Sequence, residues 1–346
     1  MPKINEAECK TQERVLALFR DPEALGYECY GNLRHQDNTN IMADKLKAWL
    51  MSSKGGGYSE PLASRAIDEL IRVAGNLQQG LYKANQEVYT LLKYGAKVRE
   101  NPGEPEKTVY FIDWERSQNN EFAIAEEVTI KGRSERRPDL VVFINGIAVA
   151  VIELKKSTVS VSHGIRQNLS NQNEHFNQPF FTTIQFVMAG NSGEGLRYGT
   201  IETPEKYYLE WKNDTVNTTA QPLDDLSLDI LEKCNQLPDK LDWQLFSMFQ
   251  KRRFLDLVHN FIVFDKGVKK VCRHNQFFGV KKALLKLGKK QGGIIWHTQG
   301  SGKTLTMVWL SKWILANNPD ARVLIVTDRD ELDDQMEKVY KGVNEQ

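Results

Sequence analysis

The chain has 346 residues, of which 40% are hydrophobic and 26% charged, and its formal net charge is +1. These values are typical of a globular protein with room for about two or three domains, and no apolar run reaches the length of a membrane span. Four scattered cysteines and six histidines without ligand spacing argue against a disulfide framework and a zinc site. No secretory signal precedes the first predicted helix, so we expect a cytoplasmic protein without a membrane partner.

Residues 1–95 predict helices, because apolar side chains recur at helical spacing and the last of these segments ends at Gly95. Between residues 107 and 190 the pattern changes to short β-branched and aromatic runs, which are typical of strands. Two runs, 139–144 and 147–154, are apolar on both faces. Such strands lie inside a sheet that helices cover on both sides.

The segment 191–221 is polar and rich in Gly, Thr and Asn, and we interpret it as an extended loop or a small excursion. Helical patterns follow, and then a strand, loop, helix, strand unit that implies a parallel sheet, with strands expected at 292–298 and 321–328. We therefore predict an α/β protein. Its predicted parts are a domain at 1–220 (helices 1–95, sheet about 107–190), a helical connection at 221–265 and a second α/β lobe at 266–346.

A basic stretch opens that second lobe. Residues 266–290 contain nine Lys or Arg and no acidic residue. This local charge suits phosphate backbones, although a solvated helical face has the same composition.

The stretch RRPDLVVFINGIAVAVIELKK, residues 136–156, places two carboxylates and a lysine around one predicted hairpin. Phosphodiester hydrolysis needs a divalent cation beside the phosphate and an activated water. We predict that Asp139, Glu153 and the main-chain carbonyl of Leu154 bind Mg²⁺. Lys155 lies two residues after Glu153 and so points to the same face, where its ammonium can orient the water or offset charge. An ordinary surface position for these residues is the alternative.

The hairpin register decides whether this site can form. A two-residue turn at 145–146 would pair Ile144 with Ile147 and carry Asp139 and Glu153 to opposite faces. We therefore predict a loop with an odd number of residues or an equivalent bulge, either of which brings the two carboxylates to one face. Gln167, on the helix after the second strand, is predicted to contact the scissile phosphate. Glu87, on an earlier helix, is a further candidate carboxylate, and for both residues a plain surface role stays open.

The segment TQGSGKT at 298–304 is a second phosphate-binding pattern, placed between an apolar run and a helix as in a P-loop. Its glycines allow main-chain N–H groups to converge on phosphates, with Lys303 at the β and γ phosphates and Thr304 at Mg²⁺. Gln276 has the donor and acceptor needed to read adenine, or it caps a helix. The predicted ATP-binding residues are Gln276, Thr298, Gly300, Ser301, Gly302, Lys303 and Thr304.

In combination these motifs resemble the restriction, or motor, subunit of type I restriction-modification enzymes. The stretches that carry the resemblance are NQEVYTLLKYGAKV, RRPDLVVFINGIAVAVIELKK, RHNQFFGV, WHTQGSGKTLTM and VTDRDELDDQ. The resemblance implies a PD-(D/E)xK restriction-endonuclease-like core with Asp139, Glu153 and Lys155 at the catalytic positions, followed by the beginning of a RecA-like lobe of a superfamily 2 helicase-like translocase. It also implies double-stranded DNA as substrate, ATP as fuel, and methyltransferase (M) and specificity (S) subunits as partners.

Two departures from the family pattern limit the resemblance. The family has a Gln-x-x-x-Tyr element, whereas Gln167 is followed four residues later by Asn171. The chain also ends at Gln346, soon after the first motor motifs, so we expect a fragment that binds ATP weakly and hydrolyses it negligibly. Two other functions stay open: a nonenzymatic DNA-binding or assembly module with an inactive nuclease core, and a repair helicase-nuclease without a methyltransferase partner.

Overall fold

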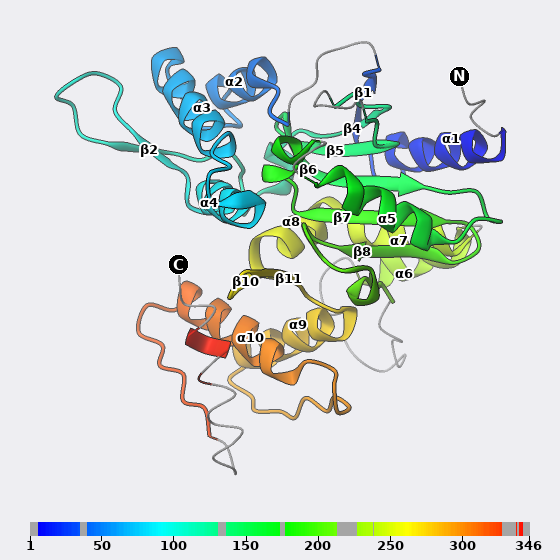
Figure 1. Ribbon diagram of the computed structural model, residues 1–346. Helices are drawn as coiled ribbons and strands as arrows, with labels where there is room; N and C mark the ends of the chain where they lie inside the picture. Colours follow the sequence, from blue (N-terminus) through cyan, green and yellow to red (C-terminus); the bar gives the residue numbers. More distant parts are fainter. Residues whose placement is uncertain are drawn as a thin grey trace.

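The computed structural model describes residues 6–34, 40–130, 136–173, 177–212, 227–237, 239–326, 337 and 339–341. Its centre is a seven-stranded mixed sheet in the order β1-β4-β5-β6-β7-β8-β9 (Figure 1). β1 pairs parallel with β4 and β6 pairs parallel with β7, and the other neighbours are antiparallel. The strands are β1 (Glu28–Asn32), β4 (Phe122–Glu126), β5 (Leu140–Ile144), β6 (Ile147–Leu154), β7 (Phe186–Asn191), β8 (Gly195–Gly199) and β9 (Leu209–Glu210).

Helices cover both faces of this sheet, which confirms the predicted α/β class. The larger core lies on one face and contains side chains of many helices, including the six named next. These six helices are α1 (Glu6–Arg20), α2 (Ala43–Met51), α3 (Glu60–Ala74), α4 (Gly80–Tyr94), α7 (Lys240–Phe249) and α8 (Lys251–Asn260). The opposite face packs against the short 3-10 helix η2 (Gln178–Thr182) and α5 (Val161–Asn171).

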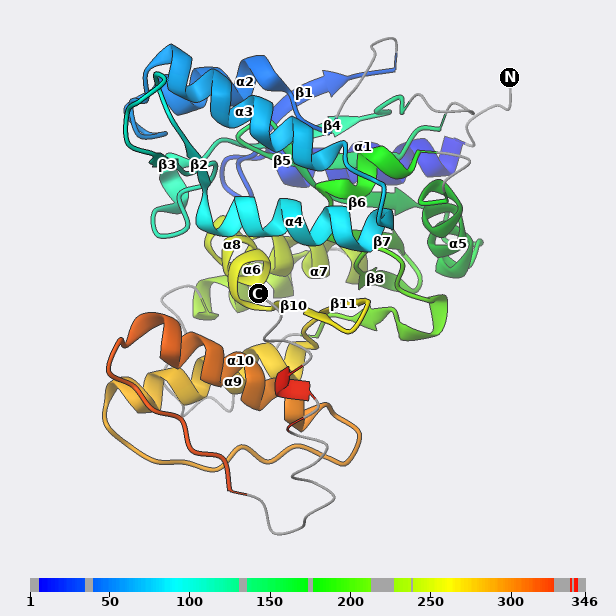
Figure 2. The same cartoon turned by 60° about the vertical axis from the view of Figure 1, so that its left-hand side comes forward.

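The remaining elements complete the chain. β2 (Ala96–Val98) and β3 (Lys107–Val109) form a separate hairpin, and η1 (Ser117–Asn119), η3 (Glu205–Tyr207) and α6 (Ser227–Gln236) are connections. A second hairpin, β10 (Ile262–Asp265) with β11 (Val268–Val271), leads into α9 (His274–Gly288) and α10 (Lys303–Asn317). Figure 2 shows α9 and α10 side by side, beneath that hairpin. Among the described helices, none is both long and apolar enough to cross a bilayer.

The hairpin of β5 and β6 has a two-residue turn and, two residues further along β6, a bulge. Ile144 pairs with Ile147, so the predicted odd loop is wrong. The register then shifts between Val142 and Phe143, which leaves Val149 as an extra residue in β6. Its carbonyl accepts a hydrogen bond from Gln185 N at 2.7 Å, so the bulge is paired to the chain before β7. The predicted equivalent bulge is therefore confirmed.

The bulge exchanges the two faces of β6. Ile147 and Val149 lie in the larger core, and so does Ala150, although strict alternation would place it on the opposite side. Beyond the bulge Val151 lies in the smaller core with Val141. The alternation then carries residue 153 to the face of residue 139, as the site requires.

Lys269 of β11 joins the second hairpin to the main body. Its buried side-chain nitrogen donates to Asn85 Oδ1 of α4 and to Gln185 Oε1, each at 2.7 Å, and to the carbonyl of Ile184 at 3.3 Å. One member of the predicted basic stretch is therefore an internal connection. The predicted domain limits at residues 220 and 265 stay predictions. α7, in the predicted helical connection, packs against β8 and α1 of the predicted first domain.

Three sequence expectations need correction. The segment 191–221 was expected to be a loop, yet it contains β8 and β9, and its residues 213–221 lie outside the described part. Segment 292–298 forms no strand, and neither does 321–326, the described part of the second expected strand; residues 327 and 328 lie outside the described part. Ile294 is 95% exposed and Leu324 is 86% exposed. A strand of a parallel sheet requires hydrogen-bonding neighbours, and the described residues supply none here.

Two hairpin turns of the same geometry allow the stability cost of backbone strain to be measured separately from the cost of crowding. Gly146 and Gly267 both have φ +83°, but a Cβ on Gly146 would lie 3.0 Å from Met42 O, whereas Gly267 has nothing within 4 Å. We expect Gly267→Ala to lower the free energy of unfolding by about 1 kcal/mol and Gly146→Ala by about 2 to 4 kcal/mol, since overpacking adds to the strain. Urea unfolding measures both, and equal losses would contradict the close packing of α2 on this turn.

The half-buried His259, near the end of α8, makes the stability of the fold depend on pH. The ring of His259 stacks on Trp114 at 4.7 Å, and burial lowers the pKa of His259 to about 4. A histidine that protonates more readily in the unfolded chain destabilises the fold as pH falls from about 6.5 towards 4. Between pH 7 and pH 5 the free energy of unfolding should fall in the natural chain. Because His259 is partly exposed, we expect this fall to be only about 1 to 2 kcal/mol smaller in His259→Phe. Urea unfolding at the two pH values tests this, and identical losses would refute it.

Candidate metal centre and phosphate-binding loop

Asp139, Glu153 and Lys155 come together at one end of β5 and β6. Leu140 pairs with Ile152, so the next residues outward, Asp139 and Glu153, lie on neighbouring positions of one face. Asp139 Oδ2 accepts a hydrogen bond from the main-chain N–H of Leu154 at 2.6 Å. Glu153 is 1% exposed, and its Oε1 lies 2.8 Å from Lys155 Nζ. A carboxylate buried this deeply needs such a cationic partner.

The side chain of Glu153 is covered by α5. A Cβ placed on Gly164 would lie 3.0 Å from Ala189 Cβ and 3.4 Å from Glu153 Cγ, so the helix backbone packs directly over the carboxylate side chain. Ser160 caps the helix, and Asn168 Nδ2 donates to Met188 O of β7 at 2.9 Å. Sequence reasoning missed Gly164, although a glycine inside a helical pattern signals close packing.

Gln167 lies on α5 one turn after Gly164, so the two residues share a helix face. It is half-buried, and its contact with a phosphate stays a prediction. Asn171, at the position of the family's tyrosine, is buried. Glu87 of α4 lies near Arg72 of α3 and does not join the carboxylate pair.

The candidate metal ligands are oxygen atoms. In the part of the chain that the structure describes, no three His, Cys, Asp or Glu side chains converge. Asp139 and Glu153 are therefore a pair of carboxylates and not part of a larger cluster of such side chains. Mg²⁺ suits such a site, because it prefers one or two carboxylates and completes its shell with water and substrate phosphate.

The second predicted site is a loop before α10. Gly300 and Gly302 have left-handed φ angles of 78° and 84°, and Ser301 Oγ donates to Thr298 O at 2.7 Å. Lys303 Nζ folds back onto the carbonyls of His297 and Thr298, at 3.1 and 3.3 Å. The side chain of Lys303 thus folds back onto the loop, which lies at the N-terminus of α10. A lysine and a helix N-terminus at one place favour the binding of an anion.

Gln276 is attached to this loop through both ends of its amide. Oε1 accepts from Arg273 N at 2.7 Å and caps α9, while Nε2 donates to Gly302 O at 2.9 Å. A Cβ on Gly302 would meet Nε2 at 2.3 Å, so only glycine allows this contact. The capping role left open by the sequence is the one observed. Adenine recognition stays a prediction, and it would require the Gln276 amide to give up its hydrogen bonds to Arg273 and Gly302.

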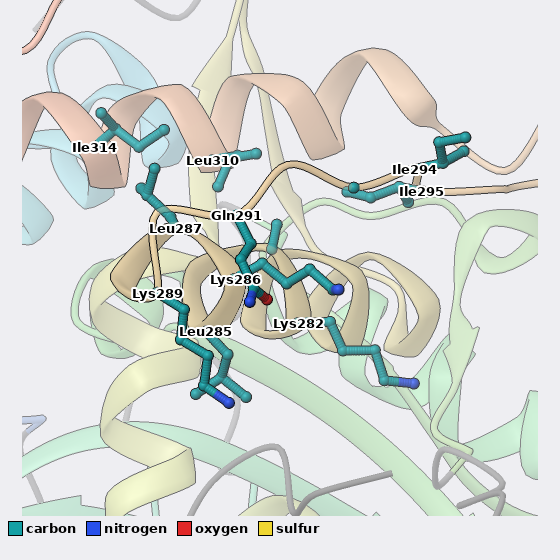
Figure 3. A pocket seen from close by; sticks show the side chains of 12 residues that line it. Lys282, Leu285, Lys286, Leu287, Lys289, Gln291, Ile294, Ile295, Leu310 and Ile314 are labelled. Atoms are coloured by element: carbon teal, nitrogen blue, oxygen red, sulfur yellow. The ribbon is translucent and has the colours of Figure 1, made fainter.

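Next to the loop, α9 and α10 leave an apolar hollow of about 550 Å³ (Figure 3). Leu285, Leu287, Leu310 and Ile314 line it together with Ile294 and Ile295 of the unpaired segment. Lys282, Lys286 and Lys289 of the basic stretch stand around it. The hollow is therefore an uncovered apolar surface of α9 and α10.

Two family models match the chain. Residues 3–207 match the family model described as type I restriction enzyme R protein N terminus, and residues 275–346 match the model of the SWI2/SNF2 ATPase. The HindI type I restriction enzyme endonuclease subunit of Haemophilus influenzae is 28% identical, over 81% of this chain and 27% of its own length.

Two further relatives agree. The putative MjaIXP endonuclease subunit of Methanocaldococcus jannaschii is 29% identical over 74% of this chain and 26% of its own length. The SauMSSORF170P subunit of Staphylococcus aureus is 24% identical over 93% of this chain and 32% of its own length. The chain thus spans about a quarter to a third of these relatives.

Gly164 offers a test of how tightly α5 fixes the carboxylate. We expect Gly164→Ala to lower the free energy of unfolding by about 1 to 3 kcal/mol, because the new methyl group meets Ala189 and Glu153. The control is Gly288→Ala on α9, which meets nothing within 4 Å and should be neutral or slightly stabilising. Urea denaturation of both variants checks this, and a neutral Gly164→Ala would show that α5 is not seated on Glu153.

Proposed function

The chain belongs to the family of type I restriction enzyme R protein N-terminal regions, and from this premise we propose that it carries an Mg²⁺-dependent endonuclease centre for double-stranded DNA. The observation that carries the proposal is the bulge at Val149, which brings Asp139 and Glu153 to one face beside Lys155. The names of the relatives, all endonuclease subunits, support it. The core would then be of the PD-(D/E)xK type.

The residues present fit a magnesium ion, since Asp139, Glu153 and the Leu154 carbonyl supply hard oxygen donors. Bound there, the ion would polarise the scissile phosphate and lower the pKa of a coordinated water. The Leu154 N–H fixes the orientation of Asp139, and α5 fixes that of Glu153. Lys155 Nζ lies 2.8 Å from Glu153 Oε1 and would stabilise negative charge that develops on the phosphate during in-line attack. Gln167 would contact the same phosphate from α5.

We further propose that residues 266–346 begin a RecA-like, ATP-dependent translocase lobe. The SWI2/SNF2 match, the glycine-rich loop before α10 and the open apolar face between α9 and α10 support this. Thr298, Gly300, Ser301, Gly302, Lys303 and Thr304 would then cradle the phosphates of ATP. Methyltransferase and specificity subunits are the proposed partners, with the specificity subunit selecting the DNA sequence.

Separate substitutions distinguish metal binding from chemistry. We expect Asp139→Asn and Glu153→Gln to abolish Mn²⁺ binding measured by titration calorimetry, because each removes a charged ligand. Lys155→Ala should retain the metal and lose nicking of supercoiled plasmid by roughly a hundredfold or more.

The controls are Asp21→Asn and Lys47→Ala. Asp21 accepts a hydrogen bond from the main-chain N–H of Glu23 at 2.9 Å, and Lys47 pairs with Glu60 at 2.7 Å; neither residue lies on β5 or β6. These two variants should match the natural chain in both assays. Undiminished Mn²⁺ binding in the Asp139 and Glu153 variants would refute the metal centre. Nicking that none of the three substitutions changes would favour a nonenzymatic module with a contaminating activity.

A further inference from the structure

The turn between β7 and β8, residues 191–194, lies beside the chain that leaves the candidate metal centre. Lys155 N donates to Gly190 O at 2.9 Å, so the chain is still paired to the end of β7 at this lysine. Residues 156–160, here called the link, then connect Lys155 to α5, which lies over β6 and β7 (Figure 1). Both groups that flank Glu153, the lysine and the helix, are therefore joined by the link.

Asn191 holds the link from within the turn. Its side chain is fully buried, with Nδ2 donating to Val159 O at 2.7 Å and Oδ1 accepting from Glu194 N at 2.6 Å. A Cβ on Gly193 would lie 3.4 Å from Ser157 O, so the turn runs against the link at van der Waals distance. A buried amide that uses both its donor and its acceptor on main-chain groups fixes the two segments relative to each other.

Glu194 holds the far end of the link. Its Oε1 accepts from Val161 N, the first residue of α5, at 3.0 Å. A carboxylate is favourable there, because the first N–H groups of a helix lack partners within the helix. Ser160, the N-cap, accepts from Ser162 N at 3.3 Å, so the two acceptors serve different N–H groups of one turn. The start of α5 is thus attached to the β7–β8 turn.

The turn itself is anchored to two helices on its other side. Arg14 of α1 donates to Ser192 Oγ and to Asp242 Oδ2 of α7, each at 2.7 Å. Gln244 of α7 accepts from Leu196 N, just after the turn, at 2.6 Å. Because α1 and α7 hold the turn in place, its side chains are fixed points against which the link is positioned.

We propose that Asn191 and Glu194 are positioning residues of the nuclease, which set Lys155 and α5 around Glu153 through the link. Because this role exists only if the centre cleaves DNA, it rests on the proposed function. Neither side chain is a metal ligand in this scheme, and both act through the main chain of the link. Misplacing a reacting group by about 1 Å can cost on the order of a hundredfold in rate, so modest loosening of the link is measurable.

Plasmid nicking with Mg²⁺ and amide hydrogen exchange test this role. We expect Asn191→Ala and Glu194→Ala each to lower kcat roughly tenfold with little change in KM, since groups that orient a metal site carry factors of this size. Glu194→Gln keeps an acceptor for Val161 N and should restore most of the rate. In both alanine variants the amides of Val159 and Val161 should exchange faster.

Combination with Lys155→Ala distinguishes positioning from general destabilisation. If Asn191 acts through Lys155, the double variant Asn191→Ala/Lys155→Ala should be little slower than Lys155→Ala alone. If Asn191 only stabilises the fold, the two losses should multiply.

The matched control is Asn120→Ala. Asn120 is also buried, and its Oδ1 accepts from Asp113 N at 2.9 Å while its Nδ2 donates to Asp113 O at 2.7 Å. It lies just before Phe122, whereas Glu126, at the other end of β4, pairs with Leu140 beside the candidate metal centre. This variant should lower the urea midpoint without changing kcat.

Unchanged kcat in both alanine variants, or an equal loss in Asn120→Ala, would overturn the positioning role. Losses that multiply between Asn191→Ala and Lys155→Ala would overturn it in favour of a turn that only stabilises the fold. Absence of nicking by the natural chain would refute the proposed function instead. Exchange needs neither DNA nor metal, so unchanged exchange at Val159 and Val161 would overturn the positioning role even then.

Discussion

One extra residue in a strand governs the geometry of the candidate metal centre. Without Val149 as a bulge, the tight turn at Asn145 and Gly146 would send the outer half of β6 to the wrong face. Glu153 would then enter the larger apolar core, where a carboxylate is costly, and Asp139 would stand alone. The fold accepts the bulge in part because Gln185 N donates to the Val149 carbonyl, so this carbonyl keeps a hydrogen-bond partner. The packing of α5 on Glu153 and the contact from Leu154 to Asp139 both depend on that displacement.

Much of this was accessible from the sequence. Apolar side chains at helical spacing identified the N-terminal helices, and short β-branched and aromatic runs identified the central strands. The requirement that two carboxylates share a face predicted an odd loop or a bulge. The position of the bulge was not predictable, because β6 is apolar on every residue from Ile147 to Ile152 and any register buries it equally well. β1 and β8 were missed for the opposite reason: both are short and contain glycine, and β1 also pairs with a strand that is distant in sequence, β4.

The expected strands near the phosphate loop illustrate a different limit. Their β propensity is strong, yet propensity becomes structure only where hydrogen-bonding neighbours exist, and the described chain offers α9 and α10 without a sheet between them. The loop itself depends on local rules, namely left-handed glycines and the start of a helix, and it forms as those rules predict. The role of Gln276 differs, since one amide cannot cap α9, hold Gly302 and read a base with the same atoms.

The buried contact of Lys269 has a mechanical consequence. The Lys269 nitrogen donates to acceptors on α4 and just before β7. Separating the β10–β11 hairpin from the body would break these hydrogen bonds together. A pull applied through α9 is therefore transmitted to the central sheet before the hairpin yields. The joint after β11 is equally firm, since Tyr198 Oη donates to Cys272 O at 2.9 Å and Phe277 of α9 packs against the ring of Trp211. β11 and the start of α9 therefore move together with the body.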